Sequence, residues 1–232
     1  MLLNSQSEQG RFMDRAIILK TCSDELYSAV LSDTLDALGY RRQALQPGIA
    51  AIEEGMRIVG FARVGIYMPI YHDDEDVNVY EHEIRFVDSL QADEVPIIVC
   101  HGNKRIAPWG ELLSTRCQYL GVAGCITDGC VRDVDMIRAM GFPVYSGGRN
   151  PADTKYRGKM MWTDVPGVIG EVDVRSGDLV LADFDGVVVV PSQMIEAVIG
   201  KALKKVRAEN TVRDELRNGA ALVDVFRKHG IL

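Results

Sequence analysis

The chain has 232 residues, a formal net charge of −7, 47% hydrophobic residues and 25% charged residues, which is ordinary globular composition with enough apolar residues for a sizeable core. The acidic balance argues against nucleic acid as a partner, because phosphate binding needs clustered lysine and arginine. No apolar run reaches the roughly 18 residues that span a bilayer, and the N-terminus lacks the pattern of a signal peptide, so we expect a cytoplasmic protein that does not bind membranes.

Helical spacing of apolar residues characterises the first forty residues. Over residues 23–40 this spacing predicts a helix with Ser23 as its cap and Gly39 as its stop. The segments 56–68 and 95–102 follow, and both predict strands because they are apolar and rich in β-branched residues.

An acidic stretch with two histidines, residues 71–83, separates these two predicted strands. It could bind a metal ion, but its spacing suits no rigid set of ligands. We therefore expect a solvated loop or helix end here.

The second half of the chain alternates predicted helices and strands. A helix predicted from Trp109 is stopped by Gly121, and its apolar stripe consists of Trp109, Leu112, Leu113, Cys117 and Leu120. A buried strand over 122–127, a helix over 134–141 and a strand within 142–148 follow. This rhythm predicts an α/β domain with partly parallel pairing.

The last part of the chain combines a hairpin and a long helix. Two strands within 174–191 flank an Asp185-Gly186 turn, a strong hairpin pattern. A helix is predicted over 192–217, and Glu209 occupies a position where its apolar stripe should continue. A carboxylate in that position is unusual for a face that packs against a core.

The five cysteines form no C-x-x-C pair and have few histidines near them, so no zinc site is expected. Cys117, Cys125 and Cys130 lie in apolar stretches and are predicted to be buried thiols.

Four charged residues cluster directly after the predicted strand 122–127: Asp128, Arg132, Asp133 and Asp135. A carboxylate here could hold a hard cation such as Mg²⁺, which takes one or two protein carboxylates and keeps several waters. The guanidinium beside it could meet a substrate oxyanion in forked geometry.

Glu111 adds a second carboxylate in the first turn of the helix predicted from Trp109. The amides around Gly110–Leu113 form a helix N-terminus, which favours an anionic group. An anion pocket beside a metal site suits a 2-oxo acid.

Each of these residues also has a purely structural interpretation. Asp128-Gly129 is a common turn pair, Arg132 and Asp133 could form a surface ion pair of little energetic value, and Glu111 could simply compensate the helix dipole. Glu209 could mark the point where its helix leaves the core. The local pattern D-G-x-x-R-D is weak by itself.

Five motifs in order give the chain a resemblance to a known family. They are MRIVGFA (56–62), WGELL (109–113), GVAGCITDGCVRD (121–133), GFPVY (141–145) and GDLVLADFDGVVVVP (177–191). Together they resemble the RraA-like family, which includes the class II 4-hydroxy-4-methyl-2-oxoglutarate/4-carboxy-4-hydroxy-2-oxoadipate aldolases. The acidic segment 71–83 is not part of that family's pattern.

The resemblance implies roles for particular residues. The aldolases resemble one another in an acidic residue, twenty intervening positions and then Arg-Asp, which matches Glu111, Arg132 and Asp133 here. It implies that Asp133 binds Mg²⁺ or Mn²⁺ directly, that Glu111 acts through metal-bound water, and that Arg132 binds the C2 oxygen of the substrate. Gly110, Leu112 and Leu113 complete the implied substrate site. Glu209 would reach the site of a neighbouring subunit, again through water.

The same resemblance implies the architecture and the activity. The expected fold is a single α/β domain over 1–232, an αββα sandwich of the swivelling β/β/α type with its core at about 25–191, assembled as homotrimers or homohexamers. The expected activity is retro-aldol cleavage of a 4-hydroxy-2-oxo acid to pyruvate, with oxaloacetate decarboxylation as a side activity.

Two other functions compete with this one. The family's namesake is a non-catalytic regulator that binds an RNA-degrading enzyme, and its shorter members lack the long C-terminal helix that carries Glu209. A methyltransferase is the other alternative, but GVAGCITDG (121–129) lacks G-x-G-x-x-G spacing and no suitable acidic residue closes a dinucleotide-binding unit.

Overall fold

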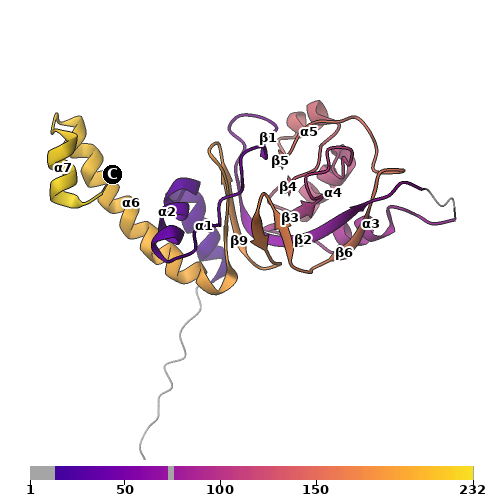
Figure 1. Cartoon of the computed structure of the whole chain (residues 1–232), viewed down its shortest axis with the longest axis horizontal. Coiled ribbons are helices and arrows are strands. Elements are labelled where there is room, and N and C mark those ends of the chain that lie inside the picture. The colour runs from indigo at the N-terminus through magenta and orange to yellow at the C-terminus, as the bar shows by residue number, and fades with distance from the viewer. Residues whose placement is uncertain (1–13, 73–75, 232) are drawn as a thin grey trace, which may run out of the picture.

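The computed structural model describes residues 14–72 and 76–231 (Figure 1). The helices are α1 (Arg15–Glu25), α2 (Ser28–Ala37), α3 (Glu81–Asp88), α4 (Glu111–Leu120), α5 (Val134–Met140), the 3-10 helix η1 (Ser192–Met194), α6 (Ile195–Arg217) and α7 (Leu222–His229). The strands are β1 (Ala50–Ala51), β2 (Ile58–Pro69), β3 (Glu94–Val99), β4 (Cys125–Thr127), β5 (Val144–Ser146), β6 (Gly158–Thr163), β7 (Gly167–Ile169), β8 (Val172–Val174), β9 (Leu179–Asp183) and β10 (Gly186–Val190). The predicted hairpin and long C-terminal helix are confirmed.

One mixed sheet of eight strands organises the described part of the chain: seven follow the order β1-β5-β4-β3-β2-β9-β10, and the eighth, β6, pairs with β2 off this path. The long strand β2 pairs along one edge first with β9 and then with β6. The pairs β2–β3, β3–β4 and β4–β5 are parallel, as the alternation of helices and strands predicts, whereas β1, β6, β9 and β10 pair antiparallel. The carboxyl ends of β3, β4 and β5 therefore lie at one edge of the sheet.

The sheet curls until it is nearly closed. Alternate residues of each strand point to opposite faces, and one face each of β2, β3, β9 and β10 contributes to a single apolar cluster. Ile126 and Tyr145 from one end of the sheet share that cluster with Val187 and Val189 from the other end. The small hairpin β7–β8 packs into the same cluster. These contacts between opposite ends are possible only because the sheet curves back on itself.

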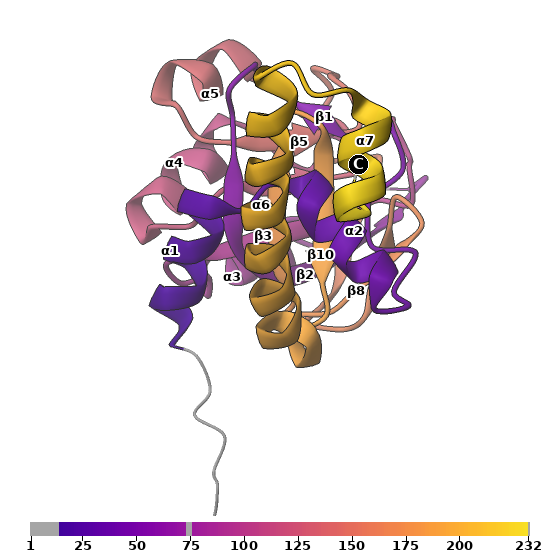
Figure 2. The same ribbon diagram turned by 90° about the vertical axis from the view of Figure 1, so that its left-hand side faces the viewer.

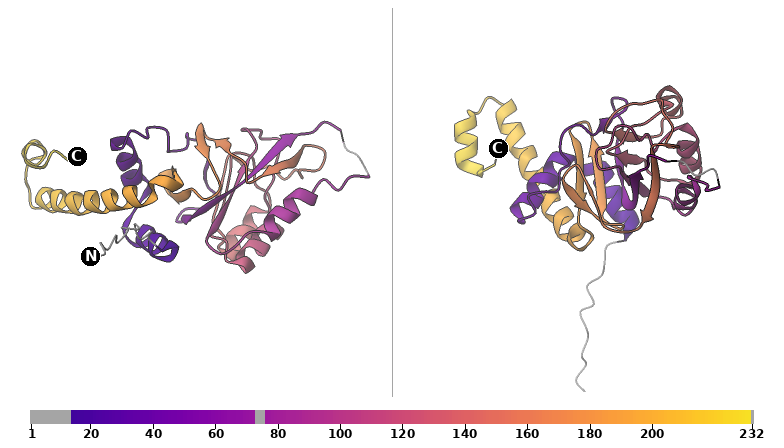
Figure 3. Two further views of the ribbon diagram at one scale, coloured as in Figure 1. Left: turned by 90° about the horizontal axis from the view of Figure 1, so that it is seen from below. Right: turned by 45° about the vertical axis from the view of Figure 1, so that its right-hand side comes forward.

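Helices cover the outside in two groups. Apolar residues of α1, α2 and α6 pack on the outer faces of β9 and β10, while α3, α4 and α5 cover the side of β3 and β4 (Figures 2 and 3). Beyond the sheet, α6 extends away from the body, and α7 folds back along it (Figure 1). The arrangement confirms the predicted α/β fold with a long C-terminal helix. In the described residues, no helix has the length and apolar character that crossing a membrane requires.

The helix predicted over 23–40 differs from the structure. The chain forms two helices, α1 and α2, separated by extended backbone at Leu26 and Tyr27, so Ser23 lies inside α1 and is not a cap. Residues far away in the sequence bond the unpaired backbone groups at the two helix ends that this break creates. Arg57 donates to the carbonyls of Cys22 and Leu26 at the end of α1, and Asp183 accepts from the backbone and hydroxyl of Ser28 at the start of α2.

The predicted stripe of α4 also needs correction. Trp109 precedes the helix and forms an isolated parallel bridge with Val131, so it does not set the helical phase. Leu112 is 76% exposed, whereas Ser114 is buried and its hydroxyl accepts a hydrogen bond from the Trp109 indole at 2.9 Å. The stop at Gly121 is confirmed, since its φ of 75° is the left-handed conformation of a helix C-cap.

Candidate active site

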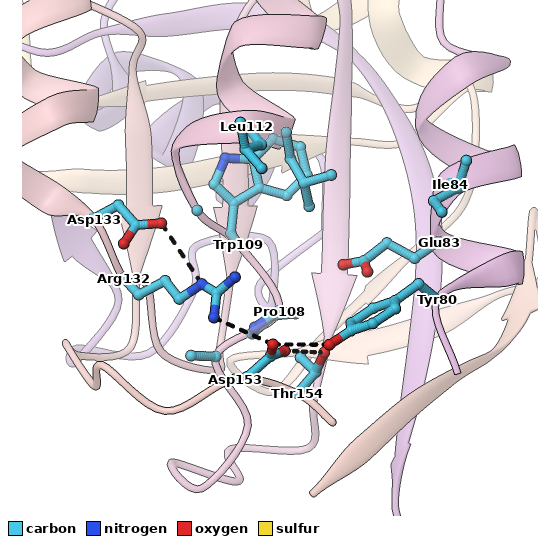
Figure 4. A pocket seen from close by; sticks show the side chains of 13 residues that line it. Tyr80, Glu83, Ile84, Pro108, Trp109, Leu112, Arg132, Asp133, Asp153 and Thr154 are labelled. Atoms are coloured by element: carbon cyan, nitrogen blue, oxygen red, sulfur yellow. Dashed lines mark hydrogen bonds and ion pairs between the residues drawn. The ribbon is translucent and has the colours of Figure 1, made fainter. Parts of the chain in front are cut away.

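A cavity of about 240 Å³ opens beyond the carboxyl ends of β3 and β4 (Figure 4). Ligands generally bind beyond the carboxyl ends of parallel strands, in barrels as in open α/β sheets. The residues that line it are Tyr80, Glu83, Ile84, Ala107, Pro108, Trp109, Gly110, Leu112, Leu113, Arg132, Asp133, Asp153 and Thr154. They come from α3, from the segment that leads into α4, from the loop between β4 and α5, and from the loop before β6.

Arg132 and Asp133 form one wall of the cavity. Their loop is held in place because the Arg132 backbone N–H donates to the Trp109 carbonyl at 3.0 Å. The Arg132 side chain lies between two carboxylates: its Nε is 3.6 Å from Asp133 Oδ2, and its terminal nitrogen is 3.4 Å from Asp153 Oδ2 (Figure 4). The guanidinium is thereby held at the cavity with part of its donor capacity free for a ligand.

Asp133 has a backbone conformation that is uncommon for a residue with a side chain. Its φ of 56° and ψ of 33° are left-handed, a region that aspartate and asparagine enter more readily than most residues but still at some cost. Such conformations cluster at functional sites. This backbone turn places the carboxylate beside Gly110 and the start of α4.

Gly110 allows this close approach. A Cβ atom at this position would lie 2.8 Å from Asp133 Oδ2 and 3.2 Å from Arg132 Cγ. The Gly110 φ of −152° is ordinary extended backbone, so glycine is required for space and not for its backbone freedom. The same Asp133 oxygen accepts the Glu111 N–H at 3.3 Å, which ties it to the first turn of α4.

Asp153 holds the opposite end of the guanidinium and was not predicted from the sequence. Burial acts to raise its pKa, but hydrogen bonds from the Tyr80 hydroxyl (2.8 Å) and the Lys155 N–H (3.2 Å), together with Arg132, hold that pKa below its usual value. Burial and the bond to Asp153 raise the pKa of Tyr80 to about 12. At neutral pH, Asp153 is therefore an anion that orients Arg132.

Glu83, on α3, is a second unpredicted residue. It is 7% exposed, and burial raises its pKa to about 7, although the hydrogen bond from the Tyr67 hydroxyl partly opposes this rise. The expectation of a solvated segment at 71–83 is therefore wrong for this residue, while Glu81 and His82 are exposed as expected. Residues 73–75 lie outside the described residues.

The predicted site residues separate into those that line the cavity and those whose side chains lie elsewhere. Gly110, Leu112, Leu113, Arg132 and Asp133 all line the one cavity. The Glu111 side chain turns along its own helix, where Oε1 accepts from the Thr115 hydroxyl at 2.7 Å.

Glu209 lies away from the cavity, on α6, where it accepts a hydrogen bond from Tyr27 and pairs with Lys205 at 3.3 Å. Its role at the site of a neighbouring subunit stays a prediction.

Asp128 has the structural role that its turn pattern suggests. It is 7% exposed, and its carboxylate accepts the N–H groups of Cys100 and Gly102. These bonds join the ends of β3 and β4 and shape the loop below the cavity. All five cysteines are buried free thiols.

The donor set suits a hard cation that keeps most of its water. Among the described residues, no group of three or more histidine, cysteine, aspartate or glutamate side chains is placed to hold a metal. Magnesium typically binds proteins through one or two carboxylates, and Asp133 offers one at the cavity, close to Gly110. Asp133 lines the cavity and is the carboxylate that could hold such a cation directly, whereas the Glu111 carboxylate is bonded to Thr115 on its own helix.

The sequence of the chain is similar to known proteins of one family. A family model described as Aldolase/RraA matches residues 28–189. A Halalkalibacterium halodurans protein, named as a candidate 4-hydroxy-4-methyl-2-oxoglutarate aldolase, is 29% identical over 184 residues, covering 79% of this chain and 81% of that protein. Protein DlpA of Legionella pneumophila is 28% identical over 195 residues, which are 84% of this chain but 31% of DlpA.

Solved structures show a related fold. The crystal structure of Streptomyces coelicolor RraAS2, described as an unusual member of the RNase ES inhibitor RraA protein family, superimposes with a TM-score of 0.77 and 28% identity. The match covers 87% of this chain and 97% of that one.

Proposed function

The chain belongs to the RraA-like family, and on that premise we propose that it is a divalent-metal-dependent lyase. Its substrate would be a 4-hydroxy-2-oxo acid, which it would cleave to pyruvate and a second oxo compound by a retro-aldol reaction. Oxaloacetate decarboxylation would be a side activity, because loss of CO₂ from oxaloacetate leaves the same pyruvate enolate.

One observation carries this proposal: the Arg132 guanidinium and the Asp133 carboxylate meet at one cavity beside the first turn of α4. Arg132 would donate to the C2 oxygen of the substrate, where negative charge grows as the C3–C4 bond breaks. The amides at the start of α4, with Gly110, Leu112 and Leu113 around them, would receive the substrate carboxylate. The contact between Arg132 and the C2 oxygen would strengthen as the enolate forms, which is the requirement for catalysis.

Mg²⁺ or Mn²⁺, held by Asp133 and through water by Glu111, would supply a Lewis acid for the two oxygens of the 2-oxo acid. The chain would contribute the orientation of the substrate. Asp153 keeps the guanidinium at the cavity, and Pro108 and Trp109 provide an apolar part of its wall.

Assembly into trimers or hexamers forms part of the proposal, since Glu209 would then complete the site of a neighbour. Glu209 lies on α6, the helix that extends from the body (Figure 1). Within one chain it accepts a hydrogen bond from Tyr27 and pairs with Lys205. Light scattering after size-exclusion chromatography would measure this assembly directly.

The test is an assay of pyruvate release from 4-hydroxy-4-methyl-2-oxoglutarate and from oxaloacetate. We expect release of pyruvate from both with Mg²⁺ or Mn²⁺, loss of the activity with EDTA, and recovery when the metal is restored in excess. Activity that survives EDTA would exclude the metal-dependent mechanism.

A non-catalytic regulator is the second candidate, and the similarity to the Streptomyces coelicolor protein favours it. That function would require no turnover of 2-oxo acids at any metal concentration. Inhibition of an RNA-degrading enzyme by the purified chain, combined with silence in the pyruvate assay, would support this candidate over the lyase.

A further inference from the structure

We infer that Glu83 is the proton-transfer residue of this cavity: its carboxylate takes the proton of the substrate's C4 hydroxyl and then returns it to C3 of the pyruvate fragment. The inference rests on the proposed function. It adds a catalytic group from a segment, residues 71–83, that lies outside the five family-like motifs of the sequence.

The position of Glu83 carries the inference. Its side chain points from α3 into the cavity, on the wall opposite Arg132 (Figure 4). Within the described ranges, the Tyr67 hydroxyl is the hydrogen-bond donor to Glu83, and it engages Oε1. A substrate whose C2 oxygen meets Arg132 would therefore extend its distal carbons toward the Glu83 carboxyl.

The other acidic groups at the cavity are committed elsewhere. Asp153 is bound to Tyr80, Thr154 and Arg132, which keeps it ionised and makes it a poor proton carrier. Asp133 faces Gly110 and the start of α4 and is the proposed cation ligand. Tyr80, with a pKa raised to about 12 by burial and by Asp153, cannot serve as a base at neutral pH.

Glu83 is surrounded by groups that suit a proton carrier. Tyr67 on β2 and Cys100 after β3 face it from the interior, and Tyr80, Asp153 and Arg132 face it from the cavity. Burial, reinforced by the charge of Asp153, raises its pKa to about 7, while Tyr67 and Arg132 act in the opposite direction. A group that titrates near the working pH can both accept and donate a proton efficiently. Carboxyls driven to different pKa values by their environments, as Glu83 and Asp153 are, commonly take different catalytic tasks.

The proton balance closes without an added reactant. The Glu83 carboxylate removes the C4 hydroxyl proton, the electron pair of that O–H bond forms the new C4=O bond, and the C3–C4 pair moves into the C2–C3 enolate. The protonated Glu83 then gives its proton to C3, which becomes the methyl group of pyruvate. The carboxylate is regenerated for the next turnover.

Oxaloacetate provides an internal comparison. Its decarboxylation has no hydroxyl proton to remove, and its enolate can take a proton from water. Replacement of Glu83 should therefore harm aldol cleavage much more than decarboxylation. A residue that only supports the fold would affect both reactions alike.

The experiment measures both reactions for wild type and for Glu83→Gln, with Glu81→Gln as the matched control on the exposed side of the same helix. We expect Glu83→Gln to lower kcat for cleavage about 100-fold or more and to change decarboxylation by about threefold or less. Wild-type kcat/KM for cleavage should fall as pH drops below about 7, where Glu83 gains its proton, and this acid limb should vanish in Glu83→Gln. Glu81→Gln should match wild type.

Tyr67→Phe offers a second measurement that needs no loss of the carboxyl. The Tyr67 hydrogen bond lowers the pKa of Glu83, so its removal should move the acid limb of cleavage to higher pH and leave the rate above the limb within a few-fold. An acid limb that stays in place would overturn the assignment.

Two further outcomes count against the inference in different ways. One outcome is that wild type is active but folded Glu83→Gln cleaves the substrate as wild type does, or loses both reactions equally. That result overturns the role of Glu83 and leaves the proposed lyase function intact. A wild type that is silent toward both substrates with Mg²⁺ and Mn²⁺ overturns the proposed function and this inference with it.

Discussion

On the wall of the cavity formed by the loop between β4 and α5, Arg132 and Asp133 are adjacent in sequence and 35% and 40% exposed. On the wall formed by α3, Glu83 is 7% exposed and bonded to Tyr67, a residue sixteen positions earlier on a buried strand. On the first wall, two side chains of opposite charge lie near each other and are partly open to water. The second wall favours the uncharged form of its carboxyl because burial penalises ionisation. The comparison shows that a partly exposed ion pair and a buried carboxyl with a raised pKa can line opposite walls of one small cavity.

The largest effect should come from removing the charge of Asp133. Asn is the appropriate replacement because it tolerates the left-handed backbone at this position. We expect Asp133→Asn to lower metal-dependent pyruvate release by about 1,000-fold, since several kcal/mol of charge stabilisation depend on the cation. Calorimetric titration with Mg²⁺ or Mn²⁺ should show the loss of binding.

Asp135→Asn is the matched control for this variant. Asp135 is two residues further on, and its side chain is 96% exposed and paired only weakly with Arg138 at 3.4 Å. It should retain wild-type turnover. If Asp133→Asn binds metal and turns over substrate as wild type does, the charged wall has no catalytic role.

A smaller loss should follow from Arg132→Lys, which keeps the charge but replaces the fork with a single ammonium group. We expect kcat/KM to fall about 100-fold, the scale of losing one oriented donor to a developing oxyanion, while the affinity for Mg²⁺ changes by about threefold or less. Initial rates and metal titration measure the two quantities separately. Arg138→Lys, on the exposed face of α5, should leave both unchanged, and an equal effect in the two lysine variants would contradict the assignment.

The smallest expected effect concerns the stability of the protein and comes from the buried carboxyl of Glu83. Because the folded chain raises the Glu83 pKa from the ordinary 4.5 to about 7, the folded state holds this proton over a pH range where the unfolded state has lost it. The contribution to the free energy of unfolding is therefore complete below about pH 4.5 and declines as pH rises to about 7. This interval sets a ceiling of about 3 kcal/mol.

Glu83→Gln, which cannot ionise, should remove that decline. We expect it to be more stable than wild type by about 1 to 2 kcal/mol at pH 8, with the difference shrinking at pH 5, as measured by urea denaturation at both values. Glu81→Gln, whose parent side chain is 48% exposed in its ion pair with Arg85, should show no such trend. A wild type that gains stability from pH 5 to pH 8 relative to Glu83→Gln would show that the carboxyl is not destabilised by burial.

One cavity residue that was not predicted, Glu83, has a recognisable pattern in the sequence. Glu83 shares the apolar stripe of Val79, Phe86, Val87 and Leu90 at helical spacing, and all four are buried. The same kind of interruption, a carboxylate on a buried stripe, is what draws attention to Glu209. Asp153 carries no comparable pattern, since it lies in an irregular loop and gains its role only when Tyr80 and Arg132 approach it.

The sequence by itself determined the elements whose patterns are local: the strands β2 and β3, the hairpin β9–β10, the stop of α4 at Gly121, and the adjacency of Arg132 and Asp133. Backbone preferences and the spacing of apolar residues act over a few positions, so they are legible in one dimension. The break between α1 and α2, the phase of α4 and the proton affinity of Glu83 were decided by the tertiary structure. Each depends on partners far away in the chain, Arg57 and Asp183 at the break or Tyr67 beneath α3, and their hydrogen bonds and burial exist only once the sheet has curled and the helices have packed.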